Sequence, residues 1–151
     1  MKLVISIVEK ASITIDNKDR KEIWEWLLVY MWVSKQDCEL SEKELVEKIE
    51  KVSNKLQNMQ VLVREWKINT SLNDINWELL LVSNFTLYGK NKKWNKIDFL
   101  DSWKFDESKK VYDMLVEKLE KDWVNLKTWK FGAYMEIESK NNWPLNYVLE
   151  F

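Results

Sequence analysis

Residues Glu78 to Leu87 read Glu-Leu-Leu-Leu-Val-Ser-Asn-Phe-Thr-Leu. Leu79 to Val82 form an unbroken apolar run bounded by polar residues, which predicts a strand buried on both faces. Residues 83–86 then bring two hydroxyls, an amide and an aromatic ring to the end of this strand. Ligands often bind at the carboxyl ends of central strands, so these four residues are candidates for a site. The alternative is a buried strand that ends in ordinary polar residues.

The length and charge of the chain restrict its class. A chain of 151 residues is long enough for one domain with a proper core. Lys and Arg total 24 against 25 Asp and Glu, a net charge of −1, so a broad footprint for duplex nucleic acid is absent. A small contact with a nucleic-acid end remains open.

Several segment types and chemistries are not expected. The sequence has no apolar run long enough to cross a membrane, and its start lacks the features of a signal peptide. A lone Cys38 excludes an internal disulfide and fits a reducing cytoplasm. The absence of histidine and of a cysteine cluster removes Ser-His and Cys-His catalysis and the usual zinc sites.

Alternating and continuous apolar stretches predict the strands. Lys2–Val8 and Ala11–Asp16 read as two strands joined by a turn at residues 9–10, and Leu27–Val33 reads as a buried strand. Further strands are expected at residues 61–63, 131–138 and 147–151, with a turn at 141–146. That turn holds the only proline, Pro144, which is a candidate for a cis bond, although a trans turn is commoner.

Two helices are expected. Ser41 and Glu44 have capping-box spacing ahead of a helix over Glu42–Leu56, and Asp106 is a candidate cap for a helix over Glu107–Lys121. With the strands, they indicate a compact α/β domain over residues 1–151. Residues 89–96 hold four lysines and read either as a solubilising loop or as a phosphate contact beside the candidate site.

Several motifs in order resemble one family, the D-aminoacyl-tRNA (D-tyrosyl-tRNA) deacylases, over nearly the whole chain. Residues 83–87, Ser-Asn-Phe-Thr-Leu, are similar to the family's Ser-Gln-Phe-Thr-Leu, and residues 8–15 resemble its first hairpin. Residues 128–135 resemble Thr-Gly-x-Phe-Gly-Ala-x-Met, residues 141–146 resemble Asn-x-Gly-Pro-Val-Thr, and Asp98-Phe99 matches part of Arg-Pro-Ser-Phe. The resemblance implies mixed β-sheets with a barrel-like core and two main helices.

Tryptophan stands where this family has glycine. The chain has 2 glycines and 10 tryptophans, where average usage of about 7% predicts roughly ten glycines. The tryptophans at family glycine positions include Trp24, Trp26, Trp32, Trp129 and Trp143, and such exchanges in turns and tight packing would overpack the fold. We hypothesise a decoding artefact. In this hypothesis the gene comes from a lineage that reads the UGA codon as glycine, and it was translated with a code that reads UGA as tryptophan. The alternative is a tryptophan-rich homologue.

The resemblance implies an enzyme that hydrolyses the ester joining a D-amino acid, or mischarged glycine, to the terminal adenosine of tRNA. Because that ester is already activated, the resemblance implies that no metal and no cofactor is needed, which agrees with a sequence that lacks histidine. Ser83, Phe85 and Thr86 would form the catalytic part, with the Phe85 N–H as a donor to the developing oxyanion. No general base is present to activate a threonine hydroxyl, so we favour attack by water assisted by the RNA 2′-hydroxyl, with Thr86 in a positioning role. Asn84, Phe131 and Met135 would bind substrate, although Phe131 and Met135 would look the same as core residues.

The same resemblance implies a homodimer, whereas the expected cytoplasmic location comes from the lone Cys38. Trp143-Pro144 stands where the family inserts a Gly-cisPro pair from the partner subunit to reject L-amino acids, a place where a residue without Cβ is required. An indole at position 143 would block the pocket or displace the motif. The alternative function is a non-catalytic module that kept the fold and binds the tRNA end or an aromatic ligand, because indoles stack on bases.

Overall fold

The computed structural model describes the chain except residues 76–77, 94, 103, 123–124 and 129, and except the side chains of residues 25–26, 92–93 and 142–144. The elements follow the order β1 (Lys2–Ile15), β2 (Asp19–Trp32), α1 (Lys35–Cys38), α2 (Glu42–Asn58), β3 (Leu62–Arg64), β4 (Lys67–Thr70), η1 (Leu72–Asp74), β5 (Glu78–Ser83), η2 (Phe85–Tyr88), β6 (Lys90–Lys93), β7 (Lys96–Asp98), α3 (Phe105–Asp122), β8 (Leu126–Thr128) and β9 (Met135–Glu150).

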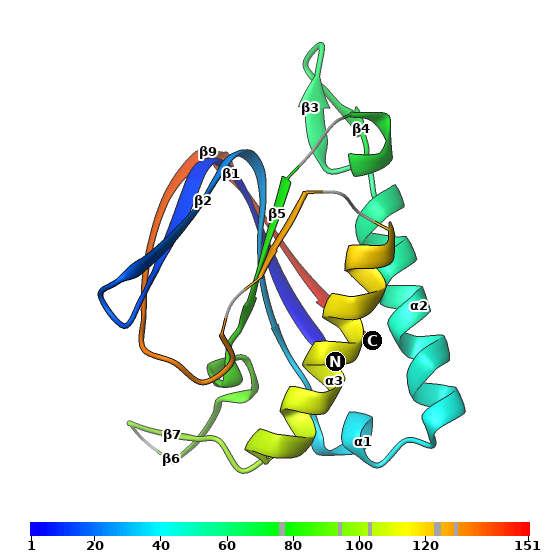
Figure 1. Cartoon of the computed structure of the whole chain (residues 1–151), viewed down its shortest axis with the longest axis vertical. Helices are drawn as coiled ribbons and strands as arrows, with labels where there is room; N and C mark the ends of the chain where they lie inside the picture. Colours follow the sequence, from blue (N-terminus) through cyan, green and yellow to red (C-terminus); the bar gives the residue numbers. More distant parts are fainter. Residues whose placement is uncertain (76–77, 94, 103, 123–124, 129) are drawn as a thin grey trace.

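The main sheet has five strands in the order β8-β5-β2-β1-β9. β1 runs antiparallel to β2 and β9, whereas β5 runs parallel to β2 and β8. Figure 1 shows the sheet curling like part of a barrel, with α2 and α3 side by side along one side of it. The predicted mixed α/β fold with a barrel-like core and two main helices is therefore confirmed.

The apolar run in β5 belongs to two cores. Leu79 and Leu81 join a large core that the sheet forms with α2 and α3. Leu80 and Val82 join a smaller core on the opposite face of the strand, together with residues of β1 and β2. All four side chains are buried, which confirms the prediction of a strand covered on both faces.

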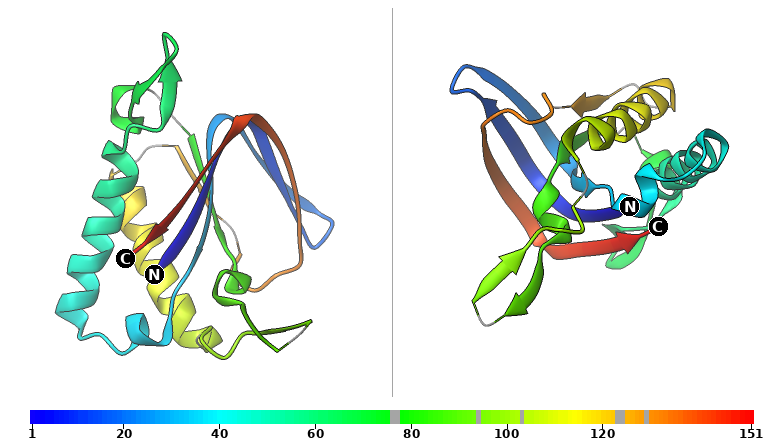
Figure 2. Two further views of the ribbon diagram at one scale, coloured as in Figure 1. Left: turned by 180° about the vertical axis from the view of Figure 1, so that it is seen from behind. Right: turned by 90° about the horizontal axis from the view of Figure 1, so that it is seen from below.

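The chain termini lie side by side beside the helices, as Figure 2 shows from two further directions. The Met1 ammonium donates to the Phe151 carbonyl oxygen at 2.9 Å, and the Phe151 N–H donates to the Met1 carbonyl oxygen at 2.9 Å. The ladder between β1 and β9 therefore continues to the ends of both strands.

The helix predictions are largely confirmed. The Ser41 Oγ accepts from the Glu44 N–H, and Glu44 accepts from the Ser41 N–H at 2.9 Å, so the expected capping box starts α2. α3 begins at Phe105, so Asp106 lies inside the first turn rather than at the cap. A carboxylate there still favours the helix, because it faces the positive end of the helix dipole. Helix α1, capped by Ser34, was not expected.

Two strand predictions were wrong in the same way. The expected break at residues 9–10 lies inside one continuous strand β1, and the expected turn at 141–146 lies inside β9. The register explains both errors, because it shifts between Ser6 and Val8 and again between Val8 and Lys10. Ser6 faces Asn146 and Val8 faces Asn141, so residues 142–145 form a bulge opposite Ile7.

The start of β9 is also later than expected, because residues 131–134 form a turn. Gly132 has φ of +77°, and a Cβ there would lie 2.4 Å from the Phe105 ring. Only glycine combines this backbone conformation with so close an approach.

The structure describes the side chains of Trp24, Trp32 and Trp66; the other seven tryptophan side chains lie outside the described residues. Trp66 has φ of +65° and is 96% exposed, in the turn between β3 and β4. Glycine is the usual residue for that conformation. Trp24 is exposed on β2, whereas Trp32 is buried at its end. The glycine hypothesis stays a prediction.

Candidate functional site

The candidate site lies where β5 leaves the sheet. Ser83 is buried and pairs with Met31 of the parallel strand β2. The Asn84 N–H donates to the Met31 carbonyl oxygen at 2.9 Å, which is the last bond of this ladder. The chain then turns into the short 3₁₀ helix η2, which carries Phe85 and Thr86 to the surface. The strand end therefore positions the exposed pair beside β2.

Asn84 holds this turn with its side chain. Its Oδ1 accepts from the Thr86 N–H at 3.1 Å and from the Thr86 hydroxyl at 2.6 Å. Such an Asx turn is a usual role for asparagine. The hydroxyl proton of Thr86 points to an amide oxygen, which is a poor base, so the contact orients the threonine without activating it as a nucleophile.

Phe85 offers an exposed ring and a backbone donor at this turn. The ring is 49% exposed and packs edge-on against Phe99, with centroids 5.2 Å apart. Among the described residues, no acceptor for the Phe85 N–H is found. A polar ligand at this turn can therefore take that hydrogen bond.

Phe131 reaches the site through Trp32. The Trp32 and Phe131 rings stack with centroids 5.3 Å apart and planes at 17°, and Trp32 also meets Phe85 edge-on at 6.3 Å. Phe105 and Tyr112 contact the other sides of Phe131. The sequence analysis did not assign Trp32 to the site, and only its place beside the Ser83 strand could have indicated it.

Met135 lies elsewhere. It pairs with Ile15 at the start of β9 and packs against the smaller core rather than in the aromatic cluster around Phe131. The structure therefore brings Ser83, Asn84, Phe85 and Thr86 together with Phe131, and it does not bring Met135 to them.

Trp143 and Pro144 lie in the β9 bulge, and their side chains and the bond between them are outside what the structure describes. The bulge faces Ile7, which pairs with Leu27, which in turn pairs with Leu79. Within one chain, the motif is thus three strands away from β5, which is roughly 14 Å across the sheet. Along the strand direction, it lies level with Leu79, about four residues or roughly 13 Å before Ser83. β9 is an edge strand of this sheet.

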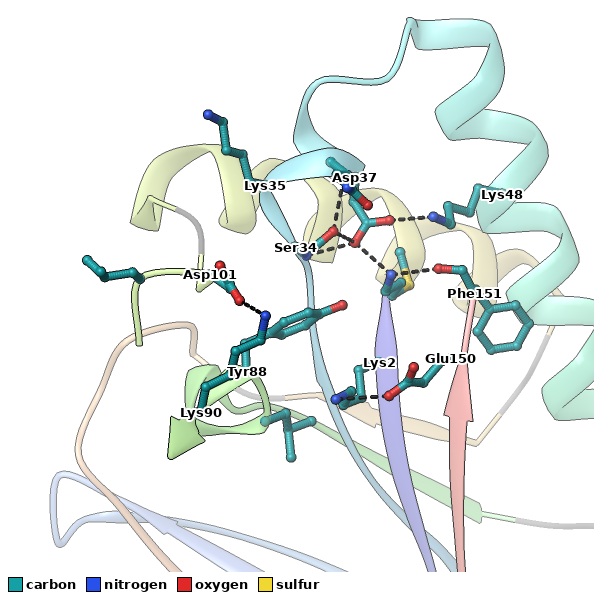
Figure 3. Close-up of a pocket in the computed structure, with 15 residues that line it drawn as sticks. Lys2, Ser34, Lys35, Asp37, Lys48, Tyr88, Lys90, Asp101, Glu150 and Phe151 are labelled. Atoms are coloured by element: carbon teal, nitrogen blue, oxygen red, sulfur yellow. Dashed lines mark hydrogen bonds and ion pairs between the residues drawn. The ribbon is translucent and has the colours of Figure 1, made fainter. Parts of the chain in front are cut away.

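A polar pocket of about 530 Å³ lies beside the chain termini and is lined in part by Leu87 and Tyr88 of η2 (Figure 3). Asp37 is buried there and pairs with the Met1 ammonium at 2.6 Å and with Lys48. Burial opposes ionisation of Asp37, but hydrogen bonds from Lys48, Met1 and Ser34 outweigh it and hold the pKa of this carboxyl below its usual value. The sequence analysis missed this cluster, which the Ser34–Asp37 capping spacing could have indicated.

Tyr88 and Lys90 connect the pocket to the hairpin of β6 and β7. Burial, and then the charge of Asp37, raise the pKa of Tyr88 to about 12, so its hydroxyl stays protonated. Lys90 pairs with Asp101. The charged groups of the pocket thus largely pair with one another, which is typical of a structural anchor.

Within the described part of the chain, no cluster of three or more metal-ligating side chains occurs. In that same part, no helix has the length and apolar character needed to span a membrane.

Comparison with known proteins identifies the class. A family model described as D-Tyr-tRNA(Tyr) deacylase matches residues 4–150. A D-aminoacyl-tRNA deacylase from Clostridium acetobutylicum is 30% identical over 151 residues, which cover 99% of this chain and 97% of the relative. One from Thermosipho melanesiensis is 33% identical over 152 residues, again covering 99% of this chain and 97% of the relative.

Solved structures agree. One titled c-Myc DNA Unwinding Element Binding Protein is 31% identical with a TM-score of 0.85, covering 100% of this chain and 99% of that one. A probable eukaryotic D-amino acid tRNA deacylase is 13% identical with a TM-score of 0.78, covering 98% and 97%, and so shares the fold. Fold and sequence together define an enzyme of the aminoacyl-tRNA deacylase class. The chain belongs to the D-Tyr-tRNA(Tyr) deacylase family.

Proposed function

We propose that this protein hydrolyses the ester of D-aminoacyl-tRNA, and of mischarged glycyl-tRNA, to release the amino acid and the tRNA. The observation that carries the proposal is the turn after β5. The match of the family model to residues 4–150 supports the same activity. That turn offers an exposed aromatic ring, a hydroxyl held in place by Asn84 and a backbone N–H for which the described part of the chain supplies no acceptor. These groups suit recognition of an ester at the end of a nucleic acid.

The proposed chemistry needs no strong base on the protein. An ester is already activated, and water assisted by the neighbouring 2′-hydroxyl attacks its carbonyl carbon. The Phe85 N–H stabilises the charge that develops on the carbonyl oxygen. Thr86 positions the substrate, because its hydroxyl is oriented by Asn84 at 2.6 Å and lacks a basic partner there.

The site is completed by a second copy of the chain in this proposal. The Trp143-Pro144 motif of one subunit enters the site of the other and rejects L-amino acids. Two observations support this arrangement: the motif lies three strands from β5 in its own chain, and it lies on edge strand β9. An isologous homodimer places two such motifs symmetrically. Activity should then fall on dilution to monomer.

The lysine-rich hairpin of β6 and β7 contacts the tRNA acceptor end in this proposal. The hairpin follows η2 directly, and Lys90 and Lys96 are exposed on it. Lysines at such a place add salt-dependent affinity for phosphates without sequence preference. A tRNA substrate also fits action in the cytoplasm.

The test is release of amino acid from D-aminoacyl-tRNA, with the L-form as control. It is run on the chain as printed and on a form that carries glycine at the ten tryptophan positions. Turnover of the D-form with sparing of the L-form is expected from the glycine form. The enzyme proposal fails if the folded glycine form turns over neither substrate.

One observation favours a second candidate, a non-catalytic module that binds the tRNA end or an aromatic ligand. Phe85 is half exposed beside the buried Trp32, and exposed aromatic rings stack on bases. Binding of uncharged tRNA by the printed chain, without turnover by either form in the hydrolysis assay, would support this candidate.

A further inference from the structure

The bulge of β9 is held at both ends by strand β1. Ser6 faces Asn146 on one side of the bulge, and Val8 faces Asn141 on the other. Residues 142–145 lie between these two pairs, opposite a single residue of β1, so they cannot follow the regular ladder. The conformation of the bulge therefore depends on how its two ends are held.

A short hydrogen bond holds the end that follows Pro144. The Ser6 hydroxyl donates to the Asn146 Oδ1 at 2.6 Å. Ser6 is only 9% exposed, so its side of the bond is shielded from water, whereas Asn146 is exposed. Both side chains are short, and Asn146 comes two residues after Pro144. The bond therefore acts directly on the segment that carries the Trp143-Pro144 motif.

A weaker contact holds the other end of the bulge. Lys140 pairs with Glu9 at 2.8 Å, but the two side chains are 71% and 45% exposed. Water and salt screen an ion pair at so open a place, and its contribution is small. The two contacts join the same two strands beside the same bulge, so the ion pair is a matched control for the Ser6–Asn146 bond.

We propose that Ser6 and Asn146 are positioning residues that set how well the enzyme distinguishes D- from L-aminoacyl esters. The bond between them fixes the bulge, and the bulge carries the motif that is proposed to reject L-amino acids. This role rests on the proposed function and deepens it, because it names the residues that hold the rejection motif. Ser6 and Asn146 act through the motif and have no part in the reaction itself.

Rejection by contact is sensitive to small displacements. A site excludes the wrong substrate when a group stands where the extra substituent would go, and a displacement of about 1 Å can change a rate by roughly 10²-fold. Loosening the bulge should therefore admit L-aminoacyl esters.

The turn after β5 should stay in place when the bulge is loosened. Ser6 pairs with Leu28, which in turn pairs with Leu80 of β5. Ser6 thus lies two strands from β5, roughly 9–10 Å across the sheet. Turnover of the D-ester should change little, so the effect should fall on selectivity.

The experiment measures kcat/KM for matched D- and L-aminoacyl-tRNA. Ser6→Ala removes the hydroxyl, Ser6→Thr keeps it, and Glu9→Gln removes the ion pair at the other end of the bulge. Each variant is made in the full-length chain, in the form, as printed or with glycine at the tryptophan positions, that hydrolyses the D-ester. We expect Ser6→Ala to lower the D-to-L ratio of kcat/KM about 2- to 13-fold, the range for loss of one neutral hydrogen bond, through faster hydrolysis of the L-ester. Ser6→Thr and Glu9→Gln should keep the parent ratio.

A double variant tests whether the two residues act as a pair. Asn146→Ala should lower the ratio as Ser6→Ala does, and the double variant should lower it no further, because both changes remove the same bond. Additive effects would overturn the proposal, since residues that act independently give additive changes. A ratio that stays at the parent value in Ser6→Ala would also overturn it, as would an equal loss of D- and L-activity, which indicates general destabilisation.

Amide hydrogen exchange gives a second readout that does not depend on activity. Ser6→Ala should raise the exchange rates of residues 145–147 about 2- to 13-fold, whereas Glu9→Gln should not. Unchanged exchange in Ser6→Ala would mean that the bond does not hold the bulge, and the proposal would be wrong. An active parent whose variants all keep its ratio counts against this role alone. If neither parent form hydrolyses either ester, the proposed function fails and this role fails with it.

Discussion

The turn between β3 and β4 gives a sharp prediction about tryptophan and glycine. Arg64 pairs with Lys67, so Glu65 and Trp66 form a two-residue loop, with φ of 51° and 65°. Two positive φ values are the pattern of a type I′ turn, whose second position favours glycine. Trp66 is 96% exposed, so its removal forfeits almost no burial. We therefore expect Trp66→Gly to stabilise the protein.

The magnitude follows from two opposing effects. A left-handed conformation costs an ordinary residue about 1–2 kcal/mol, which glycine avoids. Glycine also makes the unfolded chain more flexible, which costs about 0.4–1 kcal/mol. The net gain is about 0.5–1 kcal/mol in the free energy of unfolding, or a rise in Tm of about 1–4 °C for a chain of this size. Urea unfolding monitored by circular dichroism measures the free energy of unfolding, and differential scanning calorimetry measures Tm.

Trp24→Gly is the matched control and should have the opposite sign. Trp24 lies inside β2, and the Lys10 ammonium sits 4.1 Å from its ring centroid. Loss of this contact and the presence of glycine in a strand should together destabilise by about 1–2 kcal/mol. Equal destabilisation by both variants would refute the reasoning, because position 66 would then have no preference for glycine.

The remaining predictions concern activity and pH. Thr86→Val should lower kcat about 2- to 13-fold, the effect of one neutral hydrogen bond of about 0.5–1.5 kcal/mol, whereas loss of a true nucleophile would lower it by many orders of magnitude. Because the pKa of Asp37 is lowered in the folded state, its stabilising contribution is present above its unfolded pKa and is lost as pH falls through the folded pKa. Urea unfolding should therefore show that acid lowers the free energy of unfolding less in Asp37→Asn than in the parent protein. Lys96→Glu should raise KM for tRNA substrates and flatten its salt dependence, whereas Lys43→Glu, with the same charge change on exposed α2, should not.

Local patterns predicted the elements that depend on local physics. The Leu79–Val82 run predicts a doubly buried strand because its side chains alternate between two cores. The Ser41–Glu44 box predicts the start of α2 because capping involves neighbouring residues only. The end of this strand at residues 83–86 was predicted for the same reason, since the change from apolar to polar residues marks it; that these residues form a site stays a prediction.

Features that depend on long-range pairing could not be read in the same way. The β9 bulge at 142–145 looks like a turn in the sequence, and only pairing with β1 shows that the strand continues. Trp32 and Phe131 are far apart along the chain, so their stacking requires the three-dimensional fold. Met135 was grouped with Phe131 because both belong to one motif. In the structure, Met135 lies at the start of β9, after the turn at residues 131–134, and its side chain packs against the smaller core.

The central claim is that the turn after β5 forms a site for D-aminoacyl-tRNA. The most direct measurement is single-turnover release of D-amino acid from D-aminoacyl-tRNA by the form with glycine at the ten tryptophan positions, beside the L-aminoacyl control. We predict release from the D-form with the L-form left intact. A folded, dimeric protein that releases neither amino acid, or both at equal rates, would contradict the account.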